Sequence, residues 1–164
     1  MATSRIPIPR NGPDLSKHRP KAKPYTVIGR IPLDIGFSMG DMVNRSPQHT
    51  KAHMPTFNDT TLQSAGLPAM QLKFGWPGYE KYDFTETVPM AGKSNGQIAL
   101  AIAGAYAQFF AKALRVPGSD SKFAITPSSP WCLGNLTLRA VHHVCSDIFM
   151  AEIEYTPHPR GMMS

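Results

Sequence analysis

One helix with very few polar residues constrains the fold of this chain most. Ser94-Asn-Gly-Gln97 matches a capping box, in which the serine side chain accepts from a backbone amide and the glutamine reaches back to the cap. The predicted helix runs to about Leu114, because Val116-Pro-Gly118 cannot continue it. From residue 98 onward only Gln108 and Lys112 are strongly polar. A helix that is apolar nearly all round must be covered on nearly all sides, so we expect it at the centre of the fold.

Small side chains recur along this helix at a spacing of four, at Ala99, Ala103, Ala107 and Ala111, and the first three are predicted to be the self-association residues. Small residues on a helix let another backbone come close to it. Two interpretations follow: a central helix packed on a sheet of the same chain, or a helix that partly faces a second subunit. Charged residues make up only 17% of the chain, below the usual quarter, which favours self-association through this stripe.

The remaining elements are predicted to be mostly strands. Residues 34–66 are rich in glycine and proline and are interpreted as a long loop with at most one short element. Ser146-Asp147 is an acceptable hairpin turn between two long apolar segments. The predicted strands cover residues 25–31, 70–74, 79–88, 123–126, 136–145 and 148–155. This order predicts an α+β fold, with a mostly antiparallel sheet packed on one long buried helix.

Positive charge is concentrated at the N-terminus. The first thirty residues hold seven bases and one acid, a net charge of +6, whereas the other 134 hold ten of each and sum to zero. Residues 1–24 also contain five prolines and too little apolar surface to offset the entropy of ordering. We therefore predict a flexible basic arm over 1–24, one globular domain over 25–157 and a tail over 158–164.

A neutral body that carries a basic arm indicates an anionic partner: nucleic acid, acidic lipid or an acidic protein. Each phosphate that the arm neutralises adds a salt-dependent term to the binding free energy. Near an acidic membrane each base contributes about 1 kcal/mol. The predicted binding residues are Arg5, Arg10, Lys17, Arg19, Lys21, Lys23 and Arg30.

A phosphate-binding loop is suggested by Ala91-Gly92-Lys93-Ser94, which lies between a predicted strand and the helix. The nucleotide-binding motif needs glycine five positions before Gly92, where this chain has Thr87. Nucleotide hydrolysis is therefore not predicted. The free amides of a helix start still bind anions, so Lys93 and Ser94 are predicted to hold an isolated phosphate or sulfate.

Histidine and cysteine residues do not form a predicted metal site. His49 and His53 have the spacing of ligands on a helix, but no further ligand supports them. His143 and Cys145 share a face of a regular strand, but two ligands are too few to bind zinc. Cys132 and Cys145 form no disulfide framework. We predict no metal and no cofactor.

Carboxylates on the last strand are the remaining candidates for catalysis. Glu152 and Glu154 share one face, which we interpret as the solvated face of a half-buried strand. No enzymatic activity is predicted. A small dimeric helix-on-sheet enzyme stays open as an alternative; it would show a pocket beside the helix that contains His142 or Glu152 with a displaced pKa.

The N-terminal sequence lacks the apolar run of a signal peptide. The longest apolar stretch, Ile98 to Ala107, is far below the ~20 residues that span a bilayer. We therefore expect an intracellular protein that is not secreted and has no transmembrane segment.

Tyr79-Glu-Lys-Tyr-Asp-Phe-Thr85, followed by Ser94-Asn95 and an Ala-rich helix, resembles the strand-to-helix segment of rhabdovirus matrix proteins. The resemblance is centred on residues 79–114. It implies a non-enzymatic structural protein of the virion and host cytoplasm, which self-assembles, condenses the ribonucleoprotein and binds the acidic membrane. A nucleic-acid-binding accessory protein and a capsid-type shell protein with a basic arm are the alternatives, because a basic arm attracts nucleic acid in either class as well.

Overall fold

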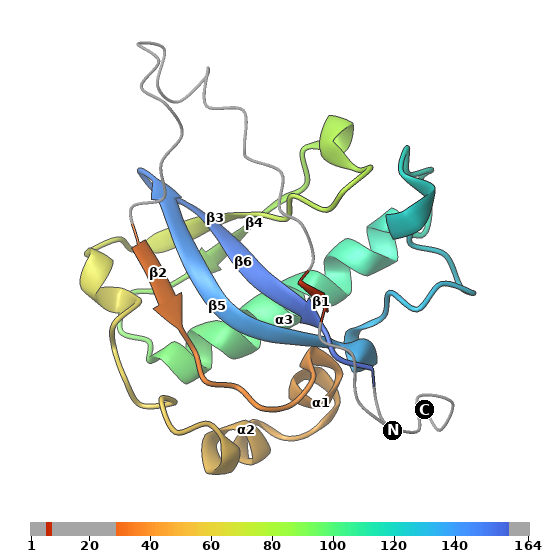
Figure 1. The fold of residues 1–164 in the computed structure, drawn as a ribbon. Coiled ribbons are helices and arrows are strands. Elements are labelled where there is room, and N and C mark those ends of the chain that lie inside the picture. Colours follow the sequence, from red (N-terminus) through yellow and green to blue (C-terminus); the bar gives the residue numbers. More distant parts are fainter. Residues whose placement is uncertain (1–5, 8–28, 158–164) are drawn as a thin grey trace.

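The computed structural model describes residues 6–7 and 29–157, and Figure 1 shows their arrangement. Six strands form one sheet in the order β2-β5-β6-β3-β4, and β1 pairs with β6 as well. The strands are β1 (Ile6–Pro7), β2 (Gly29–Pro32), β3 (Ala69–Lys73), β4 (Thr85–Pro89), β5 (Leu136–Cys145) and β6 (Ile148–Tyr155). All pairs are antiparallel except β3 with β6. The predicted α+β class, with a mostly antiparallel sheet and one long helix, is confirmed.

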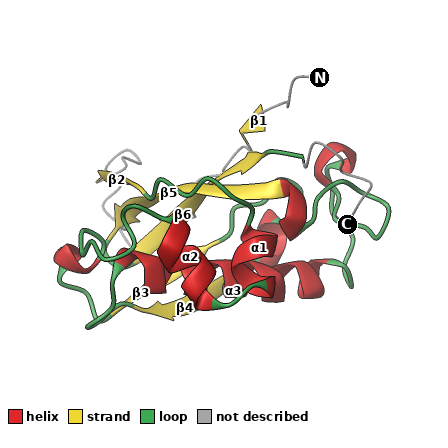
Figure 2. Ribbon diagram, turned by 90° about the horizontal axis from the view of Figure 1, so that it is seen from below, coloured by secondary structure: helices red, strands yellow, loops and turns green. Residues whose placement is uncertain are grey.

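Three α-helices, α1 (Met39–Asn44), α2 (Pro47–His53) and α3 (Asn95–Ala113), lie on one side of the β5–β6 hairpin (Figure 2). The predicted capping box is present: Gln97 N donates to Ser94 Oγ at 3.3 Å, and Ser94 N donates to Gln97 Oε1 at 2.9 Å. Leu114 ends the helix as its C-cap. Ile98 and Ile102 are fully buried, so the apolar composition of α3 reflects its central place in the core.

The predicted hairpin of β5 and β6 is confirmed, with its turn at Ser146 and Asp147. Leu138 and Ile153 are partners in the register and belong to the core that α3 shares. Register shifts occur between Leu138 and Ala140 and between His143 and Cys145. A bulge places two residues of one strand against one of its partner, so each shift changes which side chains share a face.

The segment before β4 differs from its prediction as a strand from residue 79. Residues Glu80–Tyr82 form a 3-10 turn, and Asp83 follows with φ of 49°. Tyr79 is buried, and its hydroxyl accepts a hydrogen bond from Ile125 N at 2.8 Å. The alternating pattern therefore reflects aromatic side chains that pack around a turn, and the strand begins only at Thr85.

Two other segments also differ from their predictions. Residues 123–126 form no strand, because a 3-10 turn over Ser121–Phe123 is capped by the Asp120 side chain, which accepts from Lys122 N at 3.0 Å. Residues 34–66 contain α1 and α2 in addition to a 3-10 turn over Gln63–Ala65. Their buried residues Met39, Met42, Met54 and Leu62 are scattered among polar ones, and the helices are too short to show a period.

The N-terminal region enters the sheet earlier than predicted. Ile6 pairs with Tyr155 and Pro7 with Glu154, although both lie within the range predicted as a free arm. The strand predicted from residue 25 is described from Gly29 onward. The other residues of the predicted arm and the tail over 158–164 lie outside the described residues.

Candidate functional site

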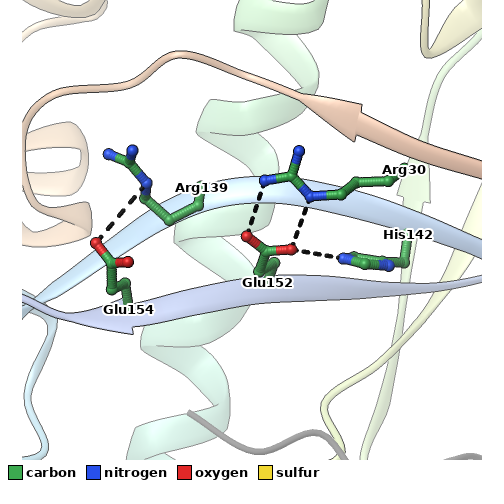
Figure 3. Close-up of polar contacts among 5 residues, drawn as sticks. All are labelled: Arg30, Arg139, His142, Glu152 and Glu154. Atoms are coloured by element: carbon green, nitrogen blue, oxygen red, sulfur yellow. Dashed lines mark hydrogen bonds and ion pairs between the residues drawn. The ribbon is translucent and has the colours of Figure 1, made fainter. Parts of the chain in front are cut away.

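A cluster of charged side chains occupies the face of the sheet opposite α3. Arg30 in β2 is the register partner of His142 in β5, so both side chains lie on one face. Glu152 in β6 lies on the same face, since its neighbours Ala151 and Ile153 belong to the core on the other side. Figure 3 shows the three side chains converging.

The Glu152 carboxylate is the centre of this cluster. Arg30 donates from Nε to Oε1 and from Nη2 to Oε2, both at 2.9 Å, which is the bidentate geometry of the stronger ion pairs. His142 Nε2 lies 2.8 Å from Oε1. These hydrogen bonds, that of Arg30 first, lower the pKa of Glu152 to about 2 against the opposing effect of burial. The carboxylate therefore stays ionised at neutral pH and holds an ion pair.

A second pair, Arg139 of β5 with Glu154 of β6, lies beside the first (Figure 3). Arg139 Nε is 3.8 Å from Glu154 Oε1, a distance too long for a hydrogen bond. The Glu154 Oε1 atom and the His142 Nδ1 atom are both buried, and neither has a hydrogen-bond partner among the described residues. The side chains of Glu152 and Glu154 are only 25% and 20% exposed. This face of the strand is therefore only partly exposed, because arginine side chains contact both carboxylates.

Among the described residues, neither His142 nor Glu152 lines a cavity beside α3, which is the arrangement that the alternative of a small helix-on-sheet enzyme predicts. Both residues lie on the opposite face of the sheet from α3. The cavity next to α3 is lined by other residues, among them Phe110 and Trp131.

The prediction of an anion site at Lys93 and Ser94 requires free backbone amides at the start of α3. This requirement is not met, because these amides already have hydrogen-bond partners within the chain. At the start of α3, Asn95 N donates to Asp59 O at 2.7 Å and Gly96 N to Phe57 O at 2.9 Å. The capping box uses the next amide, and Ile98 N donates to the Ser94 carbonyl. The helix start is therefore already occupied by the 57–62 segment of the same chain, and its amides are not available to a phosphate.

The predicted self-association stripe divides into two parts. Ala99 and Ala103 are 0% exposed and belong to the core of their own chain, so they cannot contact another subunit. The first interpretation of the stripe, a central core helix, holds for them. Ala107 is only half-buried and lines the cavity at the far end of the helix.

The histidine and cysteine motifs are not brought together. Because of the bulge after His143, Cys145 lies on the other face, in a small cluster with Val144 and Ile148, while the His143 ring stacks on Phe149. The prediction that His143 and Cys145 share a face is wrong for this reason. His53 Nδ1 is 2.9 Å from the carbonyl oxygen of His49. Within residues 6–7 and 29–157, no group of three or more possible ligands could hold a metal ion.

Of the seven bases predicted to bind nucleic acid or acidic lipid, only Arg30 is described, and its guanidinium is bound to Glu152. The others, Arg5, Arg10, Lys17, Arg19, Lys21 and Lys23, lie outside the described residues. The Arg30–Glu152 pair was missed because the two residues are 122 positions apart, and no local pattern links them.

Comparison of the chain with protein families, curated proteins and solved structures finds no match. None of the helices that the structure describes is both long and apolar enough to cross a bilayer.

Proposed function

We propose that this chain is a non-enzymatic, matrix-like structural protein of the virion and host cytoplasm. In this proposal it self-assembles and bridges a ribonucleoprotein to an acidic membrane. The observation that carries the proposal is the separation of charge along the chain. Residues 8–28 hold five bases and one acid, whereas residues 29–157 hold ten of each.

The described body neutralises much of its own positive charge. Five of its ten bases form ion pairs within the chain: Arg30 with Glu152, Arg45 with Asp41, Lys73 with Asp83, Lys112 with Glu86, and Arg139 with Glu154. A body with balanced and partly paired charge has little long-range attraction for an anion. The excess charge of residues 8–28 is therefore the main source of attraction for nucleic acid or acidic lipid.

The sheet fixes both ends of the 8–28 segment. Pro7 lies beside Glu154 of β6, and Gly29 lies beside His143 on the far side of β5. Three strand spacings and the offset along the strands separate these ends by roughly 22 Å. Twenty-one residues extend to about 70 Å, so the segment has ample length to reach a partner while both of its ends stay in the sheet.

The resemblance of residues 79–114 to rhabdovirus matrix proteins adds support, as does the low content of charged residues. A nucleic-acid-binding accessory protein or a capsid-type shell protein shares the same charge distribution. Binding to membranes together with assembly distinguishes the leading proposal from both.

The test compares full-length variants of equal charge in flotation with acidic phosphatidylserine vesicles, in RNA binding and in light scattering. The first variant changes three bases of the 8–28 segment to glutamine: Arg19, Lys21 and Lys23. The matched control changes three bases of the body that are not among those ion pairs: Lys51, Lys81 and Lys93.

We expect the first variant to lose most vesicle and RNA binding and the control to keep it. RNA binding of the natural chain should weaken with salt, with a slope near −0.7 per phosphate contacted on a single strand. If the chain is a monomer that binds RNA in a salt-sensitive way and does not bind vesicles, the result would favour the nucleic-acid-binding accessory protein. Equal losses in the two variants, or no binding to either partner, would overturn the proposal.

A further inference from the structure

A cavity of about 260 Å³ opens where the last turns of α3 meet residues 125–133. Its walls include Ala107, Phe110 and Leu114 of α3, and Ile125 and Trp131 of the facing segment. Cavities of about 150 Å³ with walls of this kind hold a benzene-sized molecule. The cavity therefore has room for an apolar group larger than one aromatic ring.

The wall formed by Trp131 is rigid. Its indole Nε1 donates to the carbonyl oxygen of Lys122 at 3.0 Å. Its ring stacks on Phe123 at 5.3 Å and meets the rings of Trp76 and Tyr155 edge-on at 5.9 and 5.2 Å. Because these contacts lie within the chain itself, they hold this wall in place, which lowers the entropic cost of binding.

Polar groups on the wall mostly bond to one another. Thr126 N donates to Ser129 Oγ at 3.2 Å, and Ser129 Oγ donates to the Thr126 carbonyl at 3.0 Å. The cavity therefore presents a mainly apolar surface to a ligand. Leu114, 50% exposed, is one of two large apolar residues that are exposed among the described residues.

Two basic residues adjoin the residues that line or support the cavity wall. Arg115 directly follows Leu114, and Lys122 Nζ lies 5.5 Å from the centre of the Phe123 ring that stacks on Trp131. Both side chains are exposed, and neither takes part in an ion pair among the described residues. Asp120 is the acidic residue of the adjoining turn, and its carboxylate caps a backbone amide.

We infer that this cavity binds the apolar chain of a single-chain anionic amphiphile, such as a fatty acid. Phe110, Leu114 and Trp131 surround the hydrocarbon, and Arg115 and Lys122 attract the carboxylate. Each methylene that leaves water strengthens binding about fourfold, so a chain of several carbons supplies most of the affinity. The inference involves no residue of the 8–28 segment and does not depend on the proposed function.

Cys132 provides a direct readout, because it lines the cavity and is exposed, whereas Cys145 is buried. Dodecanoate below its micelle concentration should protect the Cys132 thiol of the full chain from a thiol-labelling reagent, with a saturable dose response. Dodecanol should protect about tenfold more weakly, since it lacks the charge. No protection by dodecanoate, or equal protection by dodecanol, would overturn the inference.

Two tryptophan substitutions on α3 form a matched pair. Ala107→Trp fills the cavity and should weaken dodecanoate binding at least about tenfold, measured by equilibrium dialysis. Ala111→Trp adds the same side chain at an exposed position outside the cavity lining and should leave binding unchanged. Similar binding by both variants would contradict the site. The labelling experiment on the natural chain decides the matter if Ala107→Trp does not fold.

Discussion

Replacement of Glu152 by glutamine tests whether its ion pair stabilises the fold. The side chain keeps its shape but loses the charge that Arg30 and His142 contact at 2.9 and 2.8 Å. The pKa of Glu152 falls from 4.5 to about 2, which corresponds to about 3.4 kcal/mol at 1.36 kcal/mol per unit. Because the Arg30 side chain is 49% exposed, solvent screening reduces this figure to about 1.5 kcal/mol.

The contribution of the Glu152 ion pair to the free energy of unfolding decreases as pH falls. The folded-state pKa lies below the ordinary value of 4.5, so the stabilisation is complete above about pH 4.5. It is lost as pH falls from there toward 2, because the folded carboxylate then takes up a proton. Urea unfolding should therefore show Glu152→Gln less stable by about 1.5 kcal/mol at pH 7 and nearly equal to the natural chain near pH 2.

A second ion pair provides the control for this measurement. Glu86 pairs with Lys112 at 3.2 Å, with side chains 34% and 54% exposed, so Glu86→Gln should cost less than about 0.5 kcal/mol. The reasoning would be refuted if Glu152→Gln cost no more than Glu86→Gln at pH 7. A difference that stayed constant down to pH 2 would also refute it, because the cause would then not be the charge.

Two further predictions concern residues of α3 and are measured by urea unfolding at pH 7. Gly96→Ala should destabilise the protein by about 1–3 kcal/mol, because the new Cβ overlaps the Phe57 ring. Gly104→Ala should stabilise it by up to about 1 kcal/mol, because a Cβ at Gly104 meets open space and alanine favours the helix. Asn95→Ala should cost about 1–3 kcal/mol, because the buried Leu62 amide loses its acceptor; a cost below 0.5 kcal/mol would contradict this.

Two segments that form turns in place of predicted strands do so for a common physical reason. The alternation that begins at Tyr79 and the short segment that begins at Phe123 predict strands, yet both rings are buried beside turns. The turns are stabilised by contacts between distant segments, such as the bond from Ile125 N to the Tyr79 hydroxyl. Such contacts leave no periodic pattern in either segment.

The sequence by itself determined the elements whose stability is local. The capping box at Ser94, the apolar run that follows it and the turn at Ser146 and Asp147 predicted α3 and the β5–β6 hairpin, because the interactions that define them join residues close in the chain. The uneven charge was likewise visible from composition alone.

Tertiary structure alone decided which partners these elements have. It paired β3 in parallel with β6, brought Arg30 to Glu152 across 122 positions, and let the 57–62 segment occupy the helix start that was predicted to bind an anion. It also buried Ala99 and Ala103 but left Ala107 at a cavity. These outcomes depend on how segments distant in sequence pack together, and a pattern within one segment carries no information about the segment that will cover it.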